Sequence, residues 1–225
     1  MRIGRASGIV FFALSLSAAG GLLSQEPNTA MIFNRIGLSG SGELAKALSD
    51  PEVRPEDKTI VIRRLGELSK ELKANKSVPP SQLYNPILGV MVPQNSIQDH
   101  HLLRIAACET LALFADFSDA GNLISPLGTR VKSDPHEEVR LAAARALGRF
   151  YKNRQNASCL LVEALTRELG RGPQADNVRL VGALIRSLGG LQDKRAFVPL
   201  MRVIKSPFPT YTKREAQRAL ENLKW

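Results

Sequence analysis

The apolar positions of residues 133–150 repeat with the period of an α-helix. In the stretch SDPHEEVRLAAARALGRF, small or apolar side chains recur every three or four residues, and the arginines lie between them. This spacing puts the apolar side chains on one face of a helix. Asp134 is suited to the N-cap and Pro135 to the first helical position. Alanine in the middle of the face lets a neighbouring helix approach closely, so the pattern predicts a helix that packs sideways. The face consists of Val139, Ala142, Ala143, Ala146, Leu147 and Phe150.

The same pattern recurs along the chain. It returns over residues 103–114, 180–191 and 212–223, and more loosely over residues 60–68. The central leucines lie roughly 32 to 46 residues apart, a period typical of a helical solenoid. They are Leu65, Leu111, Leu147, Leu188 and Leu220. Second apolar segments lie between these helices, at residues 83–92, 123–131, 159–169 and 197–204. Each repeat is therefore predicted to be a hairpin of one first helix and the second helix that follows it.

The segment SDPHEEVRLAAARALG, echoed by SDPEVR at residues 49–54, resembles the HEAT-repeat family. It is most similar to the short HEAT-like repeats first associated with phycobilisome lyases, and the resemblance covers residues 43–225. The resemblance implies an all-α fold, an α-solenoid or superhelix of stacked HEAT-like helical hairpins. That family includes scaffolds, adaptors, lyase subunits and DNA glycosylases, so the resemblance alone does not select an activity.

The first 24 residues have the pattern of a secretory signal peptide. Arg2 and Arg5 precede an apolar run at residues 9–23, and small residues follow it. We therefore expect an exported protein, periplasmic or secreted, with a membrane anchor formed by the uncleaved segment as the alternative. Residues 25–42 are rich in Gly and Ser and are expected to be a flexible linker or a degenerate capping element before the repeat domain at residues 43–225.

Residue types that carry chemistry are few and are not arranged for catalysis. His100, His101 and His136 lack the i, i+4 spacing of a metal site on a helix, and no GxSxG or SxxK motif is present. Aromatic residues make up only 5% of the chain, too few to predict a large cofactor pocket. We expect no catalytic residues, no metal and no cofactor. Cys108 and Cys159 fall on different predicted repeats, and the sequence does not decide whether they form a disulfide.

Basic residues give the clearest functional signal. The net charge is +10, and removal of the predicted signal peptide takes away only Arg2 and Arg5, so the domain should attract anionic surfaces. On the predicted second helices, basic residues recur at nearly the same place and are predicted to bind the partner. They are Arg130, Lys132, Arg167, Arg202 and Lys205. The resemblance implies that second helices line the concave surface of the solenoid. A further basic row is predicted on the first helices, with Glu109 as its exception, and consists of Arg63, Arg145, Arg186 and Arg218.

Together these features predict an exported, non-enzymatic scaffold or adaptor that binds a protein or an anionic envelope component through a basic solenoid surface. Peripheral contact with a membrane is compatible with this charge. One alternative is a lyase-type enzyme subunit, which the N-terminal signal and the shortage of aromatic residues disfavour. Another is a nucleic-acid-binding protein, which becomes the better hypothesis if the chain is not exported; nucleic acid is not expected as a partner of an exported protein.

Overall fold

The computed structural model describes residues 29–75, 78–91 and 100–224. The predicted signal peptide at residues 1–24 lies outside the described residues, as do residues 25–28 of the predicted linker. The described part contains eleven α-helices, several of them joined by short 3₁₀ turns. The α-helices are α1 (Thr29–Asn34), α2 (Ser41–Ser49), α3 (Pro55–Ala74), α4 (Pro80–Met91), α5 (His101–Leu111), α6 (Ile124–Ser133), α7 (Glu137–Leu147), α8 (Arg154–Arg171), α9 (Val178–Leu191), α10 (Phe197–Lys205) and α11 (Thr210–Glu221).

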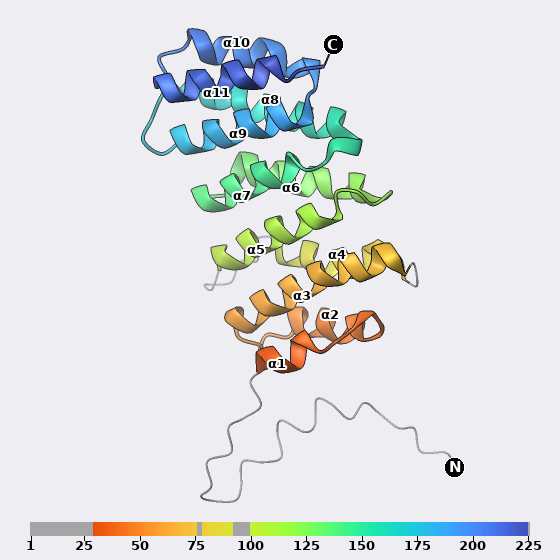
Figure 1. Ribbon diagram of the computed structural model, residues 1–225. Helices are drawn as coiled ribbons and strands as arrows, with labels where there is room; N and C mark the ends of the chain where they lie inside the picture. The colour runs from red at the N-terminus through yellow and green to blue at the C-terminus, as the bar shows by residue number, and fades with distance from the viewer. Residues whose placement is uncertain (1–28, 76–77, 92–99, 225) are drawn as a thin grey trace, which may run out of the picture.

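The helices form two layers that run along the whole molecule (Figure 1). Helices α1, α3, α5, α7, α9 and α11 pack against one another in that order and form what we call the odd-helix layer. Helices α2, α4, α6, α8 and α10 do the same in the even-helix layer. Helix α1 and the C-terminal helices lie at opposite ends of the stack (Figure 1). This architecture confirms the predicted all-α solenoid of stacked hairpins.

The hairpins are phased differently from the prediction. Helix α6 packs mainly against α7, α8 against α9, and α10 against α11, whereas the sequence pattern paired residues 103–114 with residues 123–131. The connections explain the difference. Only residues 134–136 separate α6 from α7, so the chain reverses at once and the two helices must pack together. Two 3₁₀ turns, η3 (Ala112–Phe114) and η4 (Ala120–Leu123), separate α5 from α6.

The predicted apolar face of α7 is buried. Val139, Ala143 and Leu147 have no exposed surface, and α7 contacts α5 and α9 within its layer and α6 across the layers. Burial of such a stripe is the main source of stability for a helix of eleven residues, which would be marginal alone in water. The prediction that this helix packs sideways is therefore confirmed.

Glycines at equivalent places in α3, in α9 and directly after α7 let neighbouring odd helices pack closely. A Cβ added at Gly148 would lie 3.0 Å from the Cα of Ser187 in α9, and one at Gly189 would lie 3.1 Å from the Cα of Ala219 in α11. In α3, a Cβ at Gly66 would meet the side chain of Thr110 in α5 at 2.6 Å. A larger residue at any of these glycines would force the neighbouring helix or side chain to move.

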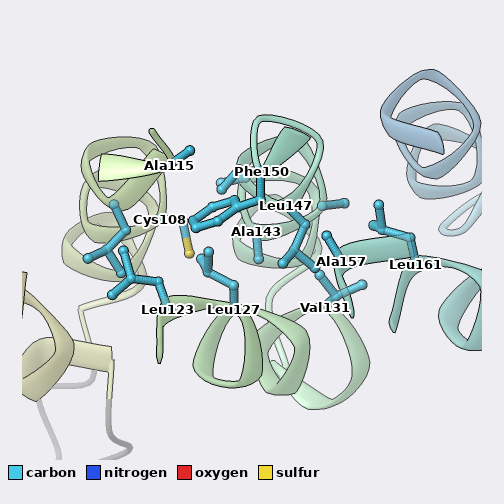
Figure 2. Close-up of a cluster of buried hydrophobic side chains, with 14 of the residues drawn as sticks. Cys108, Ala115, Leu123, Leu127, Val131, Ala143, Leu147, Phe150, Ala157 and Leu161 are labelled. Carbon is cyan, nitrogen blue, oxygen red and sulfur yellow. The ribbon is translucent and has the colours of Figure 1, made fainter. Parts of the chain in front are cut away.

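The larger core side chains fill the space between the two layers. Figure 2 shows Cys108, Leu127, Leu147 and Phe150 side by side between α5, α6 and α7. All four are completely buried. Burial raises the pKa of the Cys108 thiol to about 12. Cys108 is therefore a neutral core residue, and its contribution is packing.

Asp134 binds arginines from two helices. The carboxylate accepts hydrogen bonds from Nε and Nη2 of Arg104 in α5, at 2.8 and 3.1 Å, and lies 3.4 Å from the guanidinium of Arg130 in α6. It also accepts the backbone N–H of His136 at 3.0 Å. Asp134 was predicted as the N-cap and Pro135 as the first helical residue, but α7 begins at Glu137 with His136 as its N-cap. The turn is fixed by the buried ion cluster of Arg104, Arg130 and Asp134 that joins two successive hairpins.

Part of the segment predicted as a linker is helical. Within residues 25–42, the structure places α1, the 3₁₀ turn η2 (Leu38–Gly40) and the start of α2. Helix α1 packs against α3, and Arg64 of α3 donates a hydrogen bond to the carbonyl of Ile36 at 3.0 Å. In the part of the chain that the structure describes, none of the helices is long and apolar enough to cross a membrane.

Candidate functional site

The basic residues predicted to bind the partner lie on the even helices, and three of the five are engaged within the fold. Arg130 is only 9% exposed and belongs to the buried cluster with Asp134. Lys132 donates a hydrogen bond to Glu163 of α8. Because these two cations already have carboxylate partners, they offer little uncompensated charge to a ligand.

The other three residues of the predicted set are exposed, and of these Arg167 is engaged within the fold. The Arg167 guanidinium lies 3.3 Å from the carboxylate of Glu168, which is completely buried. Arg202 and Lys205, both exposed on α10, form no ion pair with any described residue. The structure thus spreads the five residues over different environments, and their joint role in partner binding stays a prediction.

The second predicted row lies on the odd-helix layer and faces solvent throughout. Arg63, Glu109, Arg145, Arg186 and Arg218 occupy equivalent positions on α3, α5, α7, α9 and α11, and all five are exposed. Since these helices pack side by side, the row crosses the stack of helices from one repeat to the next. We call this solvent-facing side of the layer the odd-helix face.

A hollow of about 180 Å³ lies on this face over Gly182 of α9. Leu141 in α7 occupies the position equivalent to Gly182. In place of a side chain, the Glu215 carboxylate and the Arg186 guanidinium lie over Gly182, 3.2 and 3.4 Å from where its Cβ would be. Tyr211 of α11, which is 58% exposed, contributes an aromatic wall. The other lining residues are Arg145, Val178, Arg179, Arg186 and Glu215.

The charges around this hollow are only partly compensated. Arg186 donates a hydrogen bond to Glu215 at 2.7 Å. Arg179 donates one to Glu138 at 2.8 Å, and this bond raises the pKa of the Arg179 guanidinium above its ordinary value. Among the residues that the structure describes, Arg145 has no hydrogen-bond or ion-pair partner. The hollow therefore combines excess positive charge with an aromatic surface.

A second hollow of about 170 Å³ lies between α5 and α7 on the same face. Arg145 lines both hollows, which makes them neighbours on the surface. Here the accompanying residues include Arg149, Glu109 and Leu113, whose side chain is 42% exposed. Both hollows fall below the volume of about 300–1,000 Å³ usual for drug-sized ligands. Their size suits a single side chain.

A third hollow, larger than the other two at about 670 Å³, lies where the connections after α3 and α5 meet. Both of its lysines are engaged by Asp116: Lys73 donates to the carboxylate at 2.9 Å, and Lys152 donates to the backbone carbonyl at 2.6 Å. The bond from Lys73 lowers the pKa of Asp116. Because both lysines are engaged within the fold, we assign this hollow no ligand.

Histidine and cysteine do not form a reactive cluster. The rings of His101 and His136 are stacked with their centroids 4.5 Å apart, where the start of α5 meets the start of α7. Cys108 is buried, Cys159 is exposed, and both are free thiols. In the described ranges, no group of three or more histidine, cysteine or acidic side chains could hold a metal ion.

Several residues of the odd-helix face were not singled out from the sequence. The hollow over Gly182 depends on an absent side chain, and Tyr211 and Arg149 stand outside the repeated arginine position. One signal could have revealed the hollow: alignment of the repeats places Gly182 where α7 has Leu141 and α5 has Ile105. A small residue at an otherwise bulky position on a helix face predicts a depression.

Comparison with known proteins gives a family match over one hairpin. The family model described as HEAT repeat matches residues 123–154, which contain α6 and α7. The matched unit agrees with the hairpin phasing of the structure, with α7 as its second helix. No curated protein matches the chain. The chain is thus similar to HEAT repeats over α6 and α7, and this match together with the stacked helices supports a helical-repeat protein of the kind that serves in protein interactions.

Proposed function

We propose that this protein is an exported, non-enzymatic scaffold that binds an anionic partner through the odd-helix face. The observation that supports this most is the state of Arg145, which is exposed, lines two neighbouring hollows and has no acidic partner among the described residues. A guanidinium in this state can donate two parallel hydrogen bonds to a carboxylate or phosphate. The odd-helix face therefore presents an available cation beside hollows the size of a side chain.

The mechanism would be recognition by shape and charge. Packed hairpins hold the odd helices at fixed positions, so the backbone positions of the basic residues are fixed before a partner binds. In the matched unit, α7 is the second helix, and second helices usually line the concave surface of HEAT-type solenoids. This phasing favours the odd-helix face over the even-helix face as the binding surface.

The sequence supports the proposed compartment and the proposed class of partner. The N-terminal pattern indicates export, and the net charge of +10 favours acidic proteins or anionic components of the envelope. Peripheral contact with an anionic membrane would use the same charge. Export also makes nucleic acid an unsuitable partner.

The first experiment is fractionation of native cells, with mass spectrometry of the N-terminus and crosslinked pull-down from the fraction that contains the protein. We expect an N-terminus near Gly21 or Gln25 in the exported fraction, together with an acidic crosslinked neighbour. An intact Met1 in the cytoplasmic fraction would contradict export and would favour the nucleic-acid or lyase alternative.

Paired charge reversals test the surface. Arg145→Glu should abolish crosslinking to the acidic neighbour and the salt dependence of that binding. Arg202→Glu is the matched control, because it changes net charge equally at an exposed arginine of α10 that forms no ion pair in the described part. If Arg202→Glu removes binding and Arg145→Glu does not, the partner uses the even-helix face and this proposal is wrong.

A further inference from the structure

The hollow over Gly182 has the chemistry of a carboxylate site with an apolar wall. Three arginines and one glutamate line about 180 Å³, and the exposed ring of Tyr211 stands beside them. Arg186 is paired with Glu215 through Nη1, yet a guanidinium has five N–H donors and keeps others for a ligand. A volume of about 180 Å³ is large enough for one acidic side chain, and both Tyr211 and Arg145 line it.

The aligned arginines repeat at the spacing of packed helices. Arg145, Arg186 and Arg218 hold equivalent positions on α7, α9 and α11, which contact one another in series. Packed helices lie about 8–10 Å apart. In a polyproline II segment, residues i and i+3 point to the same side and lie about 9 Å apart. A β-strand instead presents alternate residues on one side at about 7 Å, which does not match.

We infer that the odd-helix face binds an extended acidic segment of a protein partner, in polyproline II conformation, with an acidic residue at every third position. This inference rests on the proposed function and specifies its ligand. The segment crosses α7, α9 and α11, and its carboxylates pair with Arg145, Arg186 and Arg218 in turn. The carboxylate that pairs with Arg145 enters the hollow over Gly182.

Glu109 marks the end of the row. It is the equivalent residue on α5 and is exposed, and it lines the second hollow with Arg145 and Arg149. A fourth carboxylate at the same spacing would face Glu109 and be repelled. The face is therefore expected to bind three acidic residues spaced three positions apart and to repel a fourth on the α5 side.

Two labelled peptides of identical composition test the spacing. One contains glutamate at every third position with prolines between, and the other contains the same glutamates in one block followed by the same prolines. Fluorescence anisotropy with the full chain, at low and at moderate salt, measures both affinities. We expect the spaced peptide to bind about tenfold more tightly than the block peptide. Equal affinities would overturn the inferred register, because charge alone would then explain binding.

Variants assign the contacts. Arg145→Glu should lower the affinity for the spaced peptide by at least about tenfold, and Gly182→Leu, which fills the hollow, should lower it as well. Lys46→Glu, at an exposed lysine of α2 that belongs to neither predicted basic row, should leave it unchanged. Circular dichroism melting of each variant establishes that it is folded. A folded Gly182→Leu protein with unchanged affinity would contradict the role of the hollow.

A gain of binding gives a result that misfolding cannot imitate. Glu109→Lys should extend the row to α5 and improve binding of a peptide with four spaced glutamates by about two- to fivefold, the range expected for one surface ion pair. The same variant should not improve binding of the three-glutamate peptide. Failure of every peptide to bind, while the crosslinked acidic neighbour or anionic vesicles still depend on Arg145, would overturn this inference and leave the proposed function standing.

Discussion

The carboxylate of Asp134 is expected to be one of the most important single groups for stability. Asp134 is 3% exposed and lies in the turn between α6 and α7, where it accepts hydrogen bonds from Arg104 and interacts with Arg130. Asp134→Ala removes two charged hydrogen bonds from Arg104, the ion pair with Arg130 and the bond from the backbone N–H of His136. Two largely buried guanidiniums then lose this counter-charge.

The size of the effect follows from burial. Removing one member of a buried ion pair costs about 3–5 kcal/mol, because the remaining charge stays in a poorly solvated site. Glu163→Ala is the matched comparison: it also removes one carboxylate, which interacts with Lys132, but Glu163 is 64% exposed. Exposed pairs contribute about 0–1 kcal/mol. The two substitutions should therefore differ by several kcal/mol.

Urea unfolding followed by circular dichroism measures this difference. With an m-value of about 2–3 kcal/mol/M, Asp134→Ala should lower the midpoint by about 1–2 M, and Glu163→Ala by at most about 0.5 M. The triple variant Arg104→Met, Arg130→Met and Asp134→Leu should recover much of the loss, since apolar residues can replace a whole buried ion cluster. The reasoning is refuted if Asp134→Ala costs no more than Glu163→Ala.

Four further predictions concern the core and the thiols. In the native protein at about pH 8, iodoacetamide should label Cys159 and leave Cys108 unlabelled until urea is added, as mass spectrometry of the two peptides would show. The pKa of the Cys108 thiol is raised from 9.0 to about 12 by burial, so the unfolded chain ionises first and stability should fall as pH rises from about 9 towards 12; a Cys108→Ala variant with the same alkaline slope would contradict this. Ala143→Leu should destabilise by about 1–3 kcal/mol through overpacking, and an unchanged melting temperature would place Ala143 away from a helix contact. Gly148→Ala should also lower the melting temperature, because its Cβ would meet the backbone of α9.

The sequence predicts the helices and their buried faces well, for a simple physical reason. A residue such as Ala143 or Leu147 occupies the interior because of its position in a local 3.6-residue period, and that period is visible without the fold. The repeated pattern likewise predicts stacking of equivalent helices. Which two helices form a hairpin depends instead on the length of the connection between them. The pattern of apolar positions does not record this length, so it did not reveal that the short connection at residues 134–136 pairs α6 with α7.

The environment of a charged residue was harder to predict than its place on a helix. Arg130 and Arg202 follow the apolar segments of their helices at nearly the same place, yet Arg130 is buried beside Asp134 while Arg202 is exposed. The difference arises from Arg104 and Asp134, which are contributed by other elements. The hollow over Gly182 was likewise not predicted from the sequence, because three helices form it around a residue without a side chain.

The glycine contacts inside the odd-helix layer also set the dimensions of its outer surface. Gly148 and Gly189 allow α7, α9 and α11 to pack closely, and the exposed arginines lie on those same helices. The distance between equivalent arginines on neighbouring helices is thus set by the residues at the helix contacts. A larger residue at Gly148 or Gly189 would increase the distance between neighbouring arginines while leaving the arginines themselves unchanged. A ligand that spans two repeats would then bind with a different affinity.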